Sequence, residues 1–188
     1  MNKHIDQISS QQFDQYMQTL IKQRVAPSLA VTAVRGCDTV IRSGYGHLVL
    51  GEETTASAET VYLYGSMTKL FTATAVMQLR ERGLIELDRP VRDYVQDFPL
   101  RSTSGREITT RHLLSHSSGI ANPLPIKWVH LADEPEVTLD ALTSQLLTKY
   151  RRLTFEPGSR YAYSNLGYLV LGQVVERVSG ERDRKSVV

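Results

Sequence analysis

The chain has 188 residues, with 22 Lys or Arg against 20 Asp or Glu and a formal net charge of +2. This near balance gives no electrostatic reason to expect nucleic-acid binding. The length fits one globular domain, which would bury roughly 70% of the surface exposed by its unfolded chain. Cys37 is the single cysteine, so no internal disulfide can form.

The first 24 or so residues lack the apolar core and cleavage site of a secretory signal. No stretch of the sequence approaches the length of an apolar membrane span. We therefore expect a cytoplasmic protein with no membrane partner. An amphipathic helix is predicted in this region by apolar residues at helical spacing, namely Phe13, Tyr16, Met17, Leu20 and Ile21.

Between residues 28 and 50 the pattern changes to two β-branched stretches joined by Gly36-Cys37-Asp38, which predicts a β-hairpin. Gly44 and Gly46 share one strand face and predict the close approach of another element, such as a helix lying across the sheet. A hairpin alone leaves unpaired edges. We therefore expect self-association through an exposed sheet edge.

A Ser-x-x-Lys tetrad, Ser66-Met67-Thr68-Lys69, opens a helical pattern that ends at Gly83. Residues three apart share a helix face, so the Lys69 amine is expected beside the Ser66 hydroxyl. A base next to a serine makes it a nucleophile, and the unpaired N–H groups of a helix start favour an oxyanion. The run that follows is apolar nearly all round, which predicts a buried helix. The simpler interpretation makes Ser66 an N-cap and Lys69 a solvated lysine.

A second motif, Tyr163-Ser164-Asn165, follows the turn at Pro157-Gly158 and precedes an apolar helical run. The Tyr163 phenol could share the Ser66 proton with Lys69, and the Asn165 amide could hold the lysine head group or a substrate carbonyl. The alternative is a half-buried aromatic followed by an Asn cap. Each simple interpretation is reasonable alone, but the two motifs together favour a catalytic group.

Two histidines, His112 and His116, are four residues apart on a short helix that Thr109 or Thr110 could cap. This spacing suggests zinc, but Leu113 stands where zinc peptidases carry a glutamate, so structural roles are favoured.

Two further residues mark scaffold. Glu156, beside the Pro-Gly turn, is interpreted as a turn residue rather than a base. Thr138 is predicted to cap a helix whose apolar side is formed by Leu139, Leu142, Leu146 and Tyr150.

Three blocks in this order resemble the class C β-lactamase and penicillin-recognising serine hydrolase family, which includes related carboxylesterases and D-amino-acid peptidases. They are Gly65–Lys69, Arg111–Gly119, and Glu156-Pro157-Gly158 leading into Tyr163–Tyr168. The likeness extends from about Pro27 to Gly180. It implies acylation of Ser66, with Lys69 and Tyr163 as the general base pair and Asn165 positioning the substrate. It also implies an α+β, β-lactamase/transpeptidase-like fold, in which an antiparallel sheet packs with helices beside a helical region.

The third motif of that family, a Lys-Thr-Gly or His-x-Gly strand, does not occur in the 188 residues. In the family this strand edges the active site and supplies the second oxyanion N–H, and losing one such donor costs about 2.7–4 kcal/mol. We therefore expect a truncated product in which residues 1–180 form an incomplete β-lactamase-related domain without its C-terminal strands, and residues 181–188 form an atypical charged tail. The alternative is a complete small protein with a solvated tail.

The predicted function is that of a serine hydrolase that cleaves an ester or amide through an acyl-Ser66 intermediate. The expected partner is a small-molecule ester, lactam or D-peptide substrate, because these share one nucleophilic chemistry. No metal and no organic cofactor is implied. The alternative is a catalytically silent remnant, or a module that binds acyl or peptidoglycan-like ligands.

Overall fold

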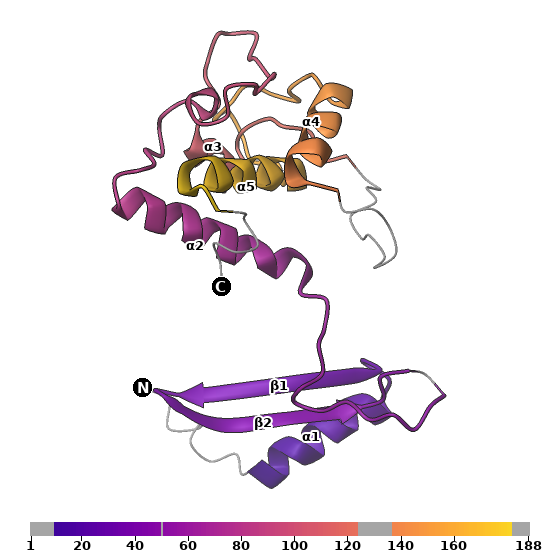
Figure 1. Ribbon diagram of the computed structural model, residues 1–188. Helices are drawn as coiled ribbons and strands as arrows, with labels where there is room; N and C mark the ends of the chain where they lie inside the picture. Colours follow the sequence, from indigo (N-terminus) through magenta and orange to yellow (C-terminus); the bar gives the residue numbers. More distant parts are fainter. Residues whose placement is uncertain (1–9, 50, 124–136, 182–188) are drawn as a thin grey trace. The chain divides into compact units, whose positions relative to one another are not determined.

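The computed structural model describes residues 10–49, 51–123 and 137–181, so that all but the first residue of the predicted charged tail lies outside the described residues. The chain forms two compact units, unit 1 (Met1–Leu63) and unit 2 (Tyr64–Val188). Figure 1 labels their helices and strands. That residues 1–180 form one domain stays a prediction.

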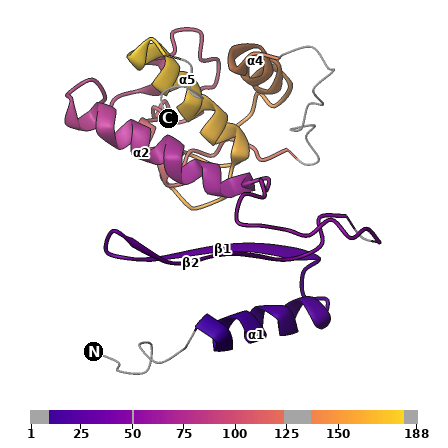
Figure 2. The same cartoon turned by 60° about the horizontal axis from the view of Figure 1, so that its bottom comes forward.

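Unit 1 is a helix packed on a β-hairpin. Its elements are α1 (Ser10–Lys22), β1 (Ser28–Arg35) and β2 (Asp38–Gly46). The strands pair antiparallel, and Gly36 enters the turn with a left-handed φ of 62°. The predicted hairpin is confirmed, although β2 ends at Gly46 and not at residue 50. Helix α1 lies along the hairpin (Figure 2). The Tyr45 hydroxyl donates a hydrogen bond to Asp14 of this helix.

The two glycines of β2 are closely approached, but mainly by the chain's own neighbouring backbone. A Cβ added at Gly44 would lie 2.4 Å from the backbone of Ser57, and one at Gly46 would lie 2.2 Å from the Pro27 carbonyl oxygen. Only the Ile21 side chain, at 3.0 Å from the Gly46 Cβ position, comes from a helix. The prediction that a helix approaches the sheet is therefore wrong at Gly44, because the backbone at Ser57 lies there instead.

Substitution of Gly44 by Ala should weaken unit 1 by about 1–3 kcal/mol, because a backbone contact as short as this one cannot be relieved by a side-chain rotation. Native-state hydrogen exchange of the β1 amides measures this loss locally. Val40→Ala, at a side chain 48% exposed, is the control and should change protection by less than about 0.5 kcal/mol. Equal protection in the two variants would contradict the close approach at Gly44.

Unit 2 is built from helices around one central helix. Its elements are the 3₁₀ turn η2 (Gly65–Met67), α2 (Thr68–Glu81), the 3₁₀ turn η3 (Val91–Asp93), α3 (Thr110–Leu114), α4 (Leu139–Lys149) and α5 (Asn165–Ser179). Helix α5 contacts α2, α3 and α4 (Figures 1 and 2). Gly83 and Gly180 follow α2 and α5 with φ of 73°, as expected for left-handed caps.

The core of unit 2 is centred on α5. Five of its side chains are fully buried, namely Leu166, Val170, Leu171, Val174 and Val175, each at 0% exposure. Val76 of α2, Leu113 of α3 and Leu147 of α4 join them in one apolar cluster. Because α5 is enclosed by three helices, its first residue is held in a fixed place relative to the start of α2.

Helix α2 buries only one face. Thr72, Ala75, Val76 and Leu79 are buried, whereas Leu70 and Phe71 are 61% and 45% exposed. The expectation of a helix buried all round is therefore wrong, because within unit 2 α2 packs on α5 along a single side. Apolar composition alone does not say how many neighbours a helix has.

The cap of α4 is as predicted, but the predicted apolar side of this helix, Leu139, Leu142, Leu146 and Tyr150, is only half-buried. The Thr138 hydroxyl caps α4 by accepting a hydrogen bond from the Ala141 N–H, as predicted. The buried side chains of α4 are Thr143 and Leu147, with Leu142 and Leu146 half-buried beside them. Over the described residues the sheet has two antiparallel strands, and its combination with helices confirms the α+β class. Self-association through the sheet edge stays a prediction.

No helix in the described ranges is both long enough and apolar enough to cross a membrane.

Candidate active site

Ser66 lies in the 3₁₀ turn η2, immediately before α2, and its side chain is exposed. Gly65 precedes it with a left-handed φ of 57°, which brings the chain sharply into the helix. Neither η2 nor α2 begins with a side-chain cap, so the simpler interpretation of Ser66 as an N-cap is wrong. Its hydroxyl is instead engaged by two other side chains.

Lys69 is half-buried, and its ammonium lies within a ring of polar and aromatic groups. Its Nζ donates to Asn165 Oδ1 at 2.7 Å and to Ser66 Oγ at 3.4 Å. The same nitrogen is 5.1 Å from the centroid of the Tyr163 ring and 5.6 Å from that of Tyr168. Lys69 is therefore not a solvated surface lysine, because its half-buried head group donates two hydrogen bonds and lies near two aromatic rings.

Tyr163 completes the group around Ser66. Its hydroxyl donates to Ser66 Oγ at 2.8 Å, across 97 residues of sequence. Burial raises the pKa of the phenol, but the hydrogen bonds to Lys69 and Ser66 and the Lys69 charge together outweigh burial and lower it. The tyrosinate form is therefore more accessible than in a free tyrosine.

Asn165 is the first residue of α5 and does not cap it. The cap is Ser164, whose hydroxyl accepts from the Gly167 N–H at 2.9 Å and donates to the Ala121 carbonyl at 3.1 Å. This leaves the Asn165 amide oxygen to accept from Lys69, while the Asn165 N–H donates to Asn122 Oδ1 at 3.0 Å. The alternative of an Asn cap is wrong, and the side chain joins the starts of α2 and α5.

The structure thus brings together the four residues that the sequence singled out, at positions 66, 69, 163 and 165. Sequence reasoning missed Asn122, which orients the start of α5, and Tyr168, which flanks the lysine head group. Tyr168 closes the third resembling block and could have been found there. Asn122 carries no comparable sequence signal, because it lies in a loop between elements.

Both histidines use Nδ1 as a hydrogen-bond acceptor. His112 Nδ1 accepts from the Thr109 N–H at 3.2 Å, and Thr109 Oγ1 accepts from the His112 N–H at 3.3 Å, which forms a reciprocal cap on α3. His116 Nδ1 accepts from the Ser164 N–H at 3.1 Å. Across the described residues, no three His, Cys, Asp or Glu side chains gather as metal ligands. These contacts give both histidines structural partners.

Glu156 anchors the turn that leads to Tyr163. Its carboxylate accepts hydrogen bonds from the hydroxyls of Ser102, Thr103 and Ser104. These bonds, led by that of Ser102, lower its pKa to about 2. A carboxylate so acidic is a poor base at neutral pH, in keeping with the predicted turn role.

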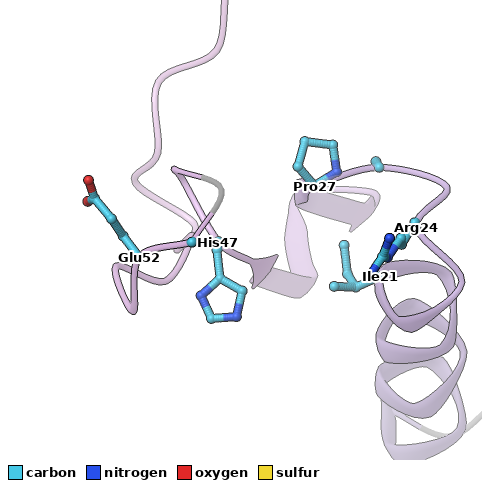
Figure 3. A pocket seen from close by; sticks show the side chains of 7 residues that line it. Ile21, Arg24, Pro27, His47 and Glu52 are labelled. Carbon is cyan, nitrogen blue, oxygen red and sulfur yellow. The ribbon is translucent and has the colours of Figure 1, made fainter.

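A separate hollow of about 660 Å³ lies in unit 1, between the end of α1 and the end of β2 (Figure 3). Its polar side chains are those of Arg24, His47 and Glu52. Figure 3 shows the Glu52 side chain pointing away from the His47 ring, with Arg24 on the opposite side beside Ile21. The polar groups do not converge on one point, so we assign no ligand to this hollow.

The α+β fold, together with a Ser-x-x-Lys serine that a lysine and a tyrosine contact, agrees with the β-lactamase-related class that the sequence resembles. The chain matches the family model described as beta-lactamase over residues 13–186, and it belongs to that family. This confirms the resemblance and the fold.

Two curated relatives and one solved structure illustrate the match. Protein flp of Staphylococcus aureus (strain N315) is 27% identical over 180 residues, which cover 95% of this chain and 35% of that protein. Penicillin-binding protein 4* of Bacillus subtilis (strain 168) is 28% identical, covering 80% of this chain and 32% of the relative. The octameric penicillin-binding protein homologue from Pyrococcus abyssi superposes with a TM-score of 0.76 at 28% identity. The match covers 96% of this chain and 41% of the homologue's chain. The chain therefore spans about a third of the length of these two curated relatives.

Proposed function

We propose that the chain is a serine hydrolase that forms an acyl-enzyme on Ser66. The observation that supports this most directly is the pair of hydrogen bonds received by Ser66 Oγ, from Tyr163 OH at 2.8 Å and from Lys69 Nζ at 3.4 Å. A serine whose oxygen is approached by two proton carriers has the arrangement of an activated nucleophile. Membership of the beta-lactamase family supports the same chemistry.

In the acylation step Tyr163 acts as the tyrosinate, which the Lys69 charge favours. The phenolate oxygen accepts the Ser66 proton while Oγ forms a bond to the substrate carbonyl carbon. Lys69 stays hydrogen-bonded to Asn165 and keeps its positive charge beside the phenolate. The resulting tetrahedral oxyanion is stabilised by the Ser66 N–H, because the first N–H groups of a helix have no partner within it.

Collapse of this intermediate breaks the bond to the leaving oxygen or nitrogen, which takes the proton from Tyr163. Water then attacks the acyl carbon and gives a proton to the phenolate of Tyr163. The second tetrahedral intermediate breaks its bond to Ser66 Oγ, which takes that proton back from Tyr163, and the acid is released. Every proton in this cycle passes through one phenol, so the position of Tyr163 relative to Ser66 controls both halves of the reaction.

The substrate class is a small ester, lactam or D-peptide, in which a carbonyl carbon carries the leaving group. Ser66 is exposed and Tyr163 is 36% exposed, so such a carbonyl can reach the hydroxyl from solvent. The relative named penicillin-binding protein 4* supports penicillins, which are lactams, as the first compounds to test.

Covalent labelling of the 188-residue chain tests this proposal. A fluorophosphonate and a fluorescent penicillin, used separately, should each increase the mass of the wild type by that of one bound probe. Peptide mapping should locate this probe on Ser66. Ser66→Ala should gain none, whereas Ser144→Ala, which removes an exposed serine of α4, should label like the wild type. An unlabelled wild type would favour the silent binding module, and a labelled Ser66→Ala would place the nucleophile elsewhere.

A further inference from the structure

One histidine holds the backbone on both sides of Tyr163. The His116 carbonyl oxygen accepts from the Ala162 N–H at 2.8 Å, and His116 Nδ1 accepts from the Ser164 N–H at 3.1 Å. His116 itself has a left-handed φ of 54°, a conformation uncommon for a residue with a side chain. This residue follows Ser115, the C-cap of α3.

The imidazole also supports the phenol ring. Its centroid is 4.4 Å from the centroid of the Tyr163 ring and 5.0 Å from that of Tyr168, each with an interplanar angle of 35°. Tyr161 meets it edge-on at 5.8 Å and 88°. The imidazole thus lies against all three tyrosines, including the one that donates to Ser66.

The hydrogen bond from Ser164 fixes the charge state of His116. An Nδ1 that accepts an N–H carries no proton, so the ring is neutral with its hydrogen on Nε2. The groups that face it are the three tyrosines and the ammonium of Lys69. Burial, followed by the positive charge of Lys69, holds the pKa of His116 below its ordinary value of 6.5.

We propose that His116 is a positioning residue for the Ser66 reaction, whose neutral imidazole holds the Tyr163 hydroxyl on the nucleophile and whose protonation releases it. The inference rests on the proposed function for its effect on rate, but the contacts themselves do not. Protonated Nδ1 becomes a donor facing the Ser164 N–H, which is also a donor, and the new cation lies near Lys69. Both effects push the Tyr163 segment away.

The sign of the pH effect follows from the lowered pKa. Because the folded state disfavours the proton on His116, the unfolded chain binds more protons as the pH falls from 6.5 toward the folded pKa. The stability that this contact contributes is therefore fully present above pH 6.5 and is lost as the pH falls from 6.5 toward the folded-state pKa of His116. Labelling of Ser66 should decline with it, with an acid midpoint below 6.5.

Two variants separate the acceptor from the ring. His116→Asn keeps an acceptor oxygen near the position of Nδ1 and tolerates a left-handed φ, but it does not titrate. His116→Phe keeps an aromatic ring and loses the acceptor. Labelling rates measured between about pH 5 and 8 should show the acid midpoint in the wild type.

The two variants should respond in opposite ways. His116→Asn, which keeps the acceptor but loses the ring beside Tyr163, should react faster than His116→Phe at pH 8 and lack that midpoint, whereas His116→Phe should be at least about tenfold slower than the wild type throughout. Labelling of His116→Phe at the wild-type rate, or the same acid midpoint in His116→Asn, would overturn the proposal.

A second measurement needs no reaction. In NMR spectra of the wild type, the Ser164 amide should shift with the same midpoint as the His116 ring, and should not follow the midpoint of His112, whose Nδ1 holds Thr109 instead. If the chain fails to label but the two signals move together, the proposed function fails and the positioning contact stands. A Ser164 amide that ignores the His116 titration would overturn the positioning role even in an active enzyme.

Discussion

Replacing Lys69 with Met should slow covalent labelling of Ser66 by about 10²–10⁴-fold, the range that a positioned base contributes, because the base Tyr163 then loses the charge that favours its phenolate form. Methionine keeps an unbranched side chain as far as Cε and removes the ammonium, whose Nζ lies 2.7 Å from Asn165 Oδ1 and 3.4 Å from Ser66 Oγ. Without that cation the phenolate form of Tyr163 is less favoured, so less of the reactive base is present at neutral pH.

The same variant should raise the pKa of Tyr163, because burial remains while the hydrogen bond and charge of Lys69 are lost. Difference absorbance of tyrosinate, with Tyr163→Phe as the subtraction, measures this change directly. Lys149→Met is the matched control, since Lys149 Nζ also lies over a tyrosine ring, 5.6 Å from that of Tyr150 at the C-terminal end of α4. It should leave both the labelling rate and the Tyr163 titration unchanged. Equal labelling of Lys69→Met and the wild type would remove Lys69 from the mechanism.

Truncating Leu171 to Ala should lower the free energy of unfolding by about 2–5 kcal/mol, because it leaves a cavity in the fully buried side of α5. Leu171 is 0% exposed and lies among the core side chains shared by α2, α3, α4 and α5. Urea denaturation followed by circular dichroism at a helix-sensitive wavelength measures the loss, with an unchanged slope against denaturant.

The control for this prediction is Leu84→Ala. Leu84 is 51% exposed just beyond the end of α2, so its truncation should cost less than about 0.5 kcal/mol. A loss below about 1 kcal/mol for Leu171→Ala would show that the centre of unit 2 relaxes around the cavity. A loss as large for Leu84→Ala would show that burial does not decide the effect.

The sequence was most informative where contacts are local. The spacing of Ser66 and Lys69 on a helix start was enough to predict that the amine lies beside the hydroxyl, and turn chemistry was enough to predict the hairpin and the helix-ending Gly83. These features depend on residues within a few positions of one another, so propensity and periodicity describe them well.

Contacts across long stretches of chain were harder to predict. No spacing rule brings Tyr163 to Ser66, and this contact was suggested by the paired motifs and by the family resemblance. The Asn165 cap was wrong because the adjacent Ser164 competes for that position and also finds the Ala121 carbonyl. The hydroxyls that bind Glu156 belong to Ser102, Thr103 and Ser104, which precede it by 52 to 54 positions, and no local pattern connects residues so far apart. Likewise, structural roles were favoured for His112 and His116, but no local pattern could show that Ser164 is a partner of His116.

The bond from Lys69 to Asn165 ties together the first residues of two helices that pack against each other in unit 2. Lys69, Tyr163 and Asn165 belong to the same unit as Ser66. We therefore expect covalent labelling of Ser66 to be lost at the temperature at which α2 and α5 melt.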